Sequence, residues 1–173
     1  IILNVLLFLI GTIFAISLLT NLVTLIPYVP SKQNYVLNII ENVKQNKKSG
    51  TIYDLGSGDG RVLFTAEKLG FKAVGYEHAL VPFLKSYIKK IITKSKVKIT
   101  FCSFFKGNLN KADVIFVYLL PLIMKRLLQK IQNECKKGTI IISSGFEIEG
   151  LNLIKFYKRD KEKNWPCIYY YQV

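Results

Sequence analysis

The chain has 173 residues, half of which are hydrophobic, and its 25 basic and 11 acidic residues give a formal net charge of +14. This length suggests one domain with appendages. The three cysteines are widely spaced and there is one histidine, so neither a disulfide framework nor a zinc or other metal site is indicated, and a reducing compartment fits best.

The N-terminal segment differs sharply from the rest of the chain. Its first 30 residues contain no charge, and residues 1–26 are almost continuously apolar. Since a bilayer-spanning helix needs about 20 such residues, we expect a single-pass transmembrane anchor over 1–26. A signal peptide, a buried core helix and an amphipathic surface helix are the alternatives. The Lys-rich flank that follows predicts a membrane protein whose catalytic domain faces the cytoplasm, or the equivalent matrix of an organelle.

All of the net positive charge lies at or after Lys32. Anionic lipid, nucleic acid and plain solvation are three explanations of such an excess. Beside a membrane helix, lipid contact or solvation is favoured. No RNA-binding aromatic motif accompanies the charge, so nucleic acid is not an expected partner.

The chain beyond the anchor predicts alternating helices and strands. A junction and leading helix occupy 27–50, with Ser31 as a candidate N-cap and apolar residues at helical spacing from Tyr35 to Val43. A cofactor-binding domain follows over 51–173. Its strands are predicted at 51–55, 72–77, 97–101, 113–119 and 139–143, its helices at 61–69, 80–93 and 122–135, and a final hairpin-like pair at 153–157 and 167–172.

Strands that are apolar throughout and alternate with helices predict an α/β fold. We expect a Rossmann-like, doubly wound, mostly parallel seven-stranded sheet. Sheets of this kind bind ligands at the carboxyl ends of their strands, near the point where the strand order reverses. The first strand ends directly at Gly56, which makes this turn the first candidate for a site.

A glycine-rich turn joins the first strand to the next helix. Glycine has no Cβ and lets the backbone turn sharply beside a ligand, while the helix N-terminus offers free N–H groups. Asp54 precedes the turn and Asp59 lies within it, and two carboxylates would repel a pyrophosphate. They suit a ligand with a sulfonium and an ammonium group, such as S-adenosylmethionine; a purely structural turn is the alternative. The expected cofactor-binding residues here are Asp54, Gly56, Ser57, Gly58, Asp59 and Gly60.

Two other predicted strand ends carry candidate residues. Glu77 ends the second strand 17 residues after Gly60, near the distance at which an acid binds ribose hydroxyls in nucleotide folds. A solvent-exposed strand end is the alternative. After the third strand, Phe104 or Phe105 can pack on an adenine and Ser103 can bond to its edge; two core aromatics fit the sequence equally well.

At these residues the chain resembles the class I, seven-β-strand S-adenosylmethionine-dependent methyltransferases. Among them it is similar to the membrane-anchored protein-lysine methyltransferases related to the mitochondrial ATP synthase c-subunit and adenine nucleotide translocase lysine methyltransferases. The resemblance covers roughly residues 27–145. It rests on the apolar N-terminal segment and on the motifs PYVPS at 27–31, DLGSGDGR at 54–61, VGYE at 74–77 and VYLLP at 117–121.

The resemblance implies roles for single residues. Asp54, with the three glycines of the turn, would hold the methionine part of S-adenosylmethionine, and Glu77 would hold the ribose. Ser103 departs from the pattern, because the family usually has an acidic residue near the adenine amino group. The segment after residue 145 is short and matches poorly, so the resemblance implies least about substrate recognition.

Tyr118, at the carboxyl end of the fourth strand, is the residue expected to line the methyl-transfer pocket, with a core tyrosine as the alternative. Pro121 would shape the rim, and Pro30 and Ser31 would close over it. The expected function is a protein-lysine N-methyltransferase that acts on a membrane-associated protein. Methyl transfer to a lipid or small molecule, and a non-catalytic membrane-anchored protein that binds S-adenosylmethionine, are the alternatives.

Overall fold

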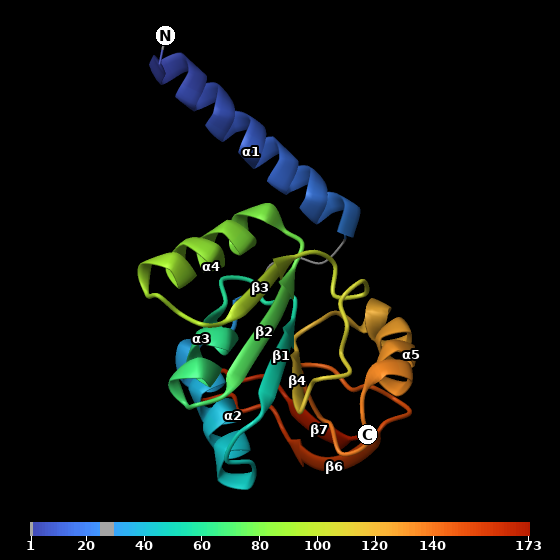
Figure 1. Cartoon of the computed structure of the whole chain (residues 1–173). Coiled ribbons are helices and arrows are strands. Elements are labelled where there is room, and N and C mark those ends of the chain that lie inside the picture. The colour runs from blue at the N-terminus through green and yellow to red at the C-terminus, as the bar shows by residue number, and fades with distance from the viewer. Residues whose placement is uncertain (1, 25–29) are drawn as a thin grey trace.

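The computed structural model describes residues 2–24 and 30–173, and within the first range the side chains of residues 13 and 16–24 are not described (Figure 1). Residues 27–29 of the predicted junction motif therefore lie outside the described residues. The helices are α1 Ile2–Thr24, α2 Gln33–Asn46, α3 Arg61–Lys68, α4 Leu80–Ile92 and α5 Met124–Glu134, with a 3-10 turn at Pro121–Ile123 before α5.

A seven-stranded sheet of order β3-β2-β1-β4-β5-β7-β6 forms the centre of the domain (Figure 1). The neighbours from β3 to β5 pair in parallel, and β7 is antiparallel to both β5 and β6. The predicted Rossmann-like sheet and its terminal hairpin are thereby confirmed. The strands are β1 Thr51–Leu55, β2 Lys72–Glu77, β3 Lys98–Phe101, β4 Val114–Val117, β5 Ile140–Ser144, β6 Asn152–Tyr157 and β7 Ile168–Gln172.

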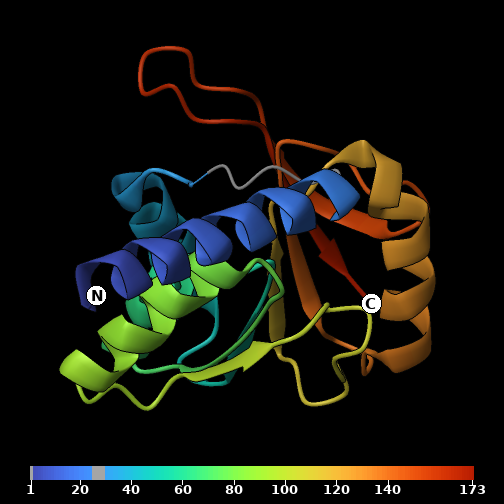
Figure 2. The ribbon, with the colours of Figure 1, turned by 90° about the horizontal axis from the view of Figure 1, so that it is seen from above.

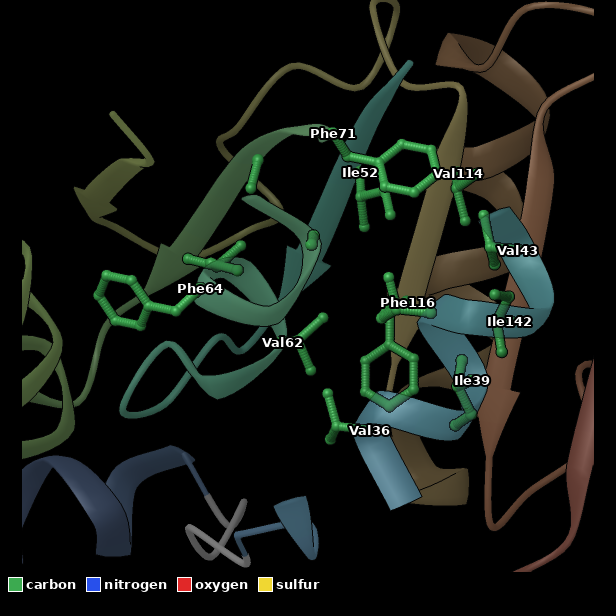
Figure 3. Packing of buried hydrophobic residues seen from close by; sticks show 14 of the residues in the cluster. Val36, Ile39, Val43, Ile52, Val62, Phe64, Phe71, Val114, Phe116 and Ile142 are labelled. Atoms are coloured by element: carbon green, nitrogen blue, oxygen red, sulfur yellow. The ribbon is translucent and has the colours of Figure 1, made fainter. Parts of the chain in front are cut away.

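The first of two apolar clusters packs α2 and α3 onto one face of the sheet. Figure 3 shows Val36 and Ile39 of α2 beside Phe116 of β4. The leading helix therefore belongs to the core of the domain, because its apolar stripe is buried. Ser31 is not its N-cap, which corrects the prediction: Lys32 holds the cap position without a side-chain cap bond, and the carbonyl of Ser31 accepts a hydrogen bond from Arg61 Nη1.

The second cluster covers the opposite face with α5 and the loop of residues 102–113. No helix connects β3 to β4, so this loop needs other support. Tyr76 provides part of it, because its hydroxyl donates to the carbonyl of Asn108 and accepts the N–H of the same residue. Lys130 of α5 provides the rest: its ammonium donates to the carbonyls of Gly107 at 2.6 Å and Phe105 at 3.3 Å.

Helix α1 lies beside α4, away from the sheet (Figures 1 and 2). Its first nine residues, 2–10, are apolar apart from Asn4, and all are exposed. Across the part of the chain that the structure describes, no helix combines the length and the apolar character that a bilayer crossing requires. The transmembrane helix predicted over 1–26 is therefore not supported.

The buried Lys130 generates a prediction about stability. Lys130→Met should lower the free energy of unfolding by about 2–3 kcal/mol, because it leaves two loop carbonyls and Glu134 without their donor in a largely buried place. Urea denaturation followed by circular dichroism measures the change. Lys125→Met, an exposed position on the same helix, should change stability by less than about 0.5 kcal/mol. Equal effects of the two substitutions would contradict this role of Lys130.

Candidate functional site

A cavity opens at the carboxyl ends of β1, β2 and β4. The strand order reverses between β1 and β4, so the cavity lies where open α/β sheets bind their ligands. The residues predicted for cofactor binding that line it are Asp54, Gly56, Ser57, Gly58, Asp59, Glu77 and Phe104. Gly60 and Ser103 are not among its lining residues.

The glycine turn adopts a conformation that side chains disfavour. Gly56, Gly58 and Gly60 have φ values of 86°, 55° and 78°, in the left-handed region. The N–H groups of Gly56 and Ser57 both donate to the carbonyl of Tyr76 on the neighbouring strand, at 2.9 and 3.0 Å. The backbone turns sharply here because glycine tolerates positive φ values, and the hydrogen bonds to β2 hold the turn in place.

Glu77 fixes the turn from the other side. Its buried carboxylate accepts the N–H of Gly58 at 2.7 Å through Oε2, and those of His78 and Ala79 at 2.8 and 2.7 Å through Oε1. The alternative of a solvent-exposed strand end is therefore wrong. A carboxylate has about four acceptor positions, and these three bonds leave capacity for a ligand hydroxyl.

Negative charge concentrates at the start of the turn. Burial raises the pKa of Asp54 well above its usual range, and the nearby carboxylates of Glu77 and Asp59 raise it further. A ligand that brings a positive group to this place would relieve both effects. The sulfonium and ammonium of S-adenosylmethionine satisfy that requirement, whereas a pyrophosphate would aggravate it.

The Pro30–Ser31 segment lies against the glycine turn. Arg61 holds it there: its guanidinium binds Asp59 at 2.6 Å (Nη2 to Oδ2) and 2.9 Å (Nε to Oδ1), and its Nη1 donates to the carbonyl of Ser31. Pro30 and Ser31 line the cavity in consequence.

Two buried polar atoms of the cavity have no hydrogen-bond partner among the described residues. They are the Oγ of Ser57 and the Nε2 of His78. Since buried polar groups are nearly always satisfied in folded proteins, such atoms fit a site that a polar ligand completes. With the carboxylate of Glu77 and the electronegative turn, they match the hydroxyls, ammonium and sulfonium of S-adenosylmethionine.

The part of the cavity that follows β3 is lined by Phe104 and Cys102 and is apolar. Phe104 is buried and lines it, whereas Phe105 packs against Phe104 and carries the guanidinium of Arg126 over its ring. Of the two phenylalanines that the sequence left open, Phe104 therefore faces the cavity, and it also belongs to the core. Cys102 lines the cavity beside it.

Tyr118 lies between this cavity and a second one. It lines both, and so do Pro30 and Ser31. Its ring is half-buried and packs against the core, so the pocket role and the core role coincide. Gly145 makes room for the ring, since a Cβ at that position would lie 3.2 Å from it. Pro121 is exposed and lines neither cavity.

Arg61, His78 and Cys102 line the cavity but were not assigned to it from the sequence. Each follows a predicted feature directly: Arg61 ends the DLGSGDGR motif, His78 follows Glu77, and Cys102 follows the third strand. For His78 and Cys102 the available signal was their position next to a strand end, and for Arg61 it was membership of the glycine-rich motif. No cluster of potential metal ligands occurs among the described residues.

The fold and this site define a Rossmann-like methyltransferase. A family model described as the ANTKMT methyltransferase domain matches residues 54–155. A protein-lysine N-methyltransferase of Saccharolobus islandicus is 31% identical over 153 residues, covering 86% of this chain and 94% of that protein. The chain belongs to the ANTKMT methyltransferase family, and its cofactor is S-adenosylmethionine; the family predicted from the sequence is confirmed.

Other relatives extend this picture. The ATP synthase c-subunit lysine N-methyltransferase of Xenopus laevis is 30% identical over 125 residues, and the match spans 70% of this chain and 54% of that protein. The chain thus spans about half the length of this vertebrate relative. An RNA methyltransferase of Salinibacter ruber, solved with S-adenosyl-L-homocysteine, shares the fold with a TM-score of 0.73 and 23% identity, covering 84% of this chain and 94% of that one.

The raised pKa of Asp54 predicts that this carboxylate lowers the stability of the unliganded protein while it strengthens ligand binding. Below the unfolded-state pKa near 3.8, Asp54 is protonated in both the folded and the unfolded state and does not lower the stability of the protein. As the pH rises through the higher folded-state pKa, the folded protein loses stability, because the buried group must become charged. Asp54→Asn should therefore make the unliganded protein more stable at pH 7.5 and little changed at pH 4. It should also weaken S-adenosylhomocysteine binding by about tenfold or more. Thermal unfolding at both pH values and calorimetry measure the two effects.

Asp113→Asn is the matched control of opposite sign. Burial raises the pKa of Asp113, but hydrogen bonds from Lys136 and from the N–H of Thr51 outweigh it and lower the pKa below its usual range. This carboxylate stabilises the fold above pH 3.8, so its removal should destabilise the protein at pH 7.5. If both variants shift stability in the same direction, the electrostatic account of Asp54 is wrong.

Proposed function

We propose that this protein is an S-adenosylmethionine-dependent protein-lysine N-methyltransferase that acts at a membrane surface. The observation that carries the proposal is the pair of adjoining cavities, one suited to the cofactor and one open to an acceptor, with Tyr118 between them. Relatives named as lysine methyltransferases support the choice of acceptor.

When bound, S-adenosylmethionine supplies a methyl group on a sulfonium sulfur, a leaving group that needs no further activation. What the protein must add is orientation and exclusion of water. Glu77 and the glycine turn fix the cofactor end of the site, and Pro30–Ser31 covers it. Tyr118 lies at the junction of the two cavities, where it can direct an incoming amine toward the methyl group.

An amine attacks only in its neutral form, and an apolar site favours that form over the ammonium. Tyr118 and the apolar residues around it supply such surroundings without a dedicated base. The protein needs no histidine or cysteine constellation for this reaction, because the proton of the lysine ammonium can leave to solvent before the amine enters the site.

Action at a membrane is supported by the outer face of α4. This helix exposes five large apolar side chains, with exposed lysines among them at positions 85 and 89 and a further one, Lys94, just beyond its end. A basic helix with an apolar face suits the boundary of an anionic membrane. Helix α1 contacts α4, and its residues 2–10 are exposed and apolar apart from Asn4. The apolar residues of α4 are Leu84, Tyr87, Ile88, Ile91 and Ile92.

Transfer of labelled methyl groups tests the enzymatic function. The chain and tritiated S-adenosylmethionine should label lysine side chains of membrane-fraction proteins, identified by mass spectrometry. Asp54→Ala and Gly58→Arg should reduce labelling at least a hundredfold, since the first removes a carboxylate of the site and the second fills a turn at φ 55°. Label in the organic phase alone would select a lipid acceptor, and cofactor binding without any labelling would select a non-catalytic protein.

Vesicle flotation tests the membrane surface. The full chain should float with vesicles containing phosphatidylglycerol and bind vesicles of pure phosphatidylcholine less. Ile88→Ser combined with Ile91→Ser should weaken binding about tenfold, because it removes two exposed apolar anchors. Leu122→Ser removes one apolar side chain that is more exposed than either isoleucine but lies before α5, and it should have little effect. A full chain that fails to float, or a double variant that binds as the control does, would refute the proposal for α4.

A further inference from the structure

The second cavity lies between the residue 30–32 junction and the loop that joins β6 to β7. Its volume of about 490 Å³ is in the range of ligand sites. We propose that it binds a substrate peptide in which an acidic residue neighbours the acceptor lysine: the lysine side chain reaches Tyr118, and the neighbouring carboxylate pairs with Arg159. This inference rests on the proposed function and deepens it.

The loop of residues 158–167 is an ordered wall, although it extends away from the sheet (Figure 2). Asp160 and Trp165 pair in antiparallel fashion through two backbone hydrogen bonds of 2.9 and 3.1 Å. Across the cavity, Lys32 Nζ donates to the carbonyl of Lys163 at 3.2 Å and ties the two walls together. The loop lies beyond residues 54–155, the range that the family model matches.

Aromatic rings make the interior of the cavity suitable for an aliphatic stem. Trp165 packs against Tyr35 with ring centroids 5.7 Å apart, and the rings of Phe146 and Tyr118 also line the cavity. The methylene groups of a lysine side chain match such surroundings, and the rings also attract a methylated ammonium product. The indole N–H of Trp165 has no acceptor among the described residues, and a peptide carbonyl would provide one.

The charges that line the cavity have one sign. Lys32 and Arg159 are both exposed and basic, and no carboxylate belongs to the described lining of this cavity. Positive potential opposes entry of a lysine as its ammonium and so favours the neutral amine that attacks. The same potential attracts a carboxylate on the peptide beside the acceptor. The same two basic side chains would therefore favour the reactive form of the amine and select peptides with an acidic residue beside the acceptor lysine.

Peptide kinetics test the proposal. Peptides with a single lysine flanked by Glu, Gln or Arg would be assayed with the wild-type chain and with Arg159 variants. The wild type should prefer the Glu peptide over the Arg peptide by about fivefold in kcat/KM, mainly through KM, as expected for a partly screened ion pair. Arg159→Gln should abolish this preference, Arg159→Glu should reverse it, and Arg159→Lys should retain it.

Two controls separate this effect from damage to the fold. Lys125→Glu makes the same charge reversal on α5, which does not line the cavity, and should keep the wild-type preference. Trp165→Phe keeps a ring but removes the indole N–H, and should raise KM for every peptide several-fold. Affinity for S-adenosylhomocysteine should stay within twofold of the wild type in all of these variants.

The possible outcomes distinguish a failure of the peptide preference from a failure of the proposed function. A preference that is equal in the wild type, Arg159→Gln and Arg159→Glu, or absent from the wild type while lysine peptides are methylated, overturns this inference and leaves the proposed function intact. A wild-type chain that binds S-adenosylhomocysteine but methylates no lysine in any peptide or membrane protein overturns the proposed function, and this inference with it.

Discussion

The carboxylate of Glu77 is the constraint on which the site depends. It accepts three backbone N–H groups, one from the glycine turn after β1 and two from the chain leaving β2. Two adjacent strand exits are thereby joined through one buried side chain. These hydrogen bonds stabilise the turn, because the three backbone N–H groups would otherwise be buried without an acceptor. The fold holds the cofactor end of the site rigid before any ligand arrives.

The two cavities divide the chemical requirements of methyl transfer. The first concentrates carboxylates around Asp54, which a cationic cofactor neutralises. The second holds aromatic rings and basic groups, which suit a neutral amine. Tyr118 borders both, because β4 ends at Val117 and its next residue leaves the sheet at the point where the strand order reverses. Opposite electrostatic environments therefore meet at the place where the methyl group must move.

The sequence predicted the sheet, the glycine turn and Glu77 because each depends on local rules of periodicity, backbone freedom and strand ends. It did not predict the support of the 102–113 loop by Lys130 or the second wall formed by residues 158–167. Both depend on contacts between segments distant in the sequence. The helical cap at Ser31 was predicted wrongly because the carbonyl of Ser31 serves a tertiary contact with Arg61 instead. The apolar N-terminal segment predicted a helix correctly, but the transmembrane role drawn from its composition is not supported.

Calorimetric binding of S-adenosylhomocysteine to Glu77→Gln tests the central role of this carboxylate most directly. The amide can accept through one atom only, so its NH₂ group would face a backbone N–H that the carboxylate now binds. Affinity should fall at least tenfold while Glu41→Gln, an exposed carboxylate on α2, leaves it unchanged. A folded Glu77→Gln protein that binds the ligand within twofold of the wild type would contradict the account.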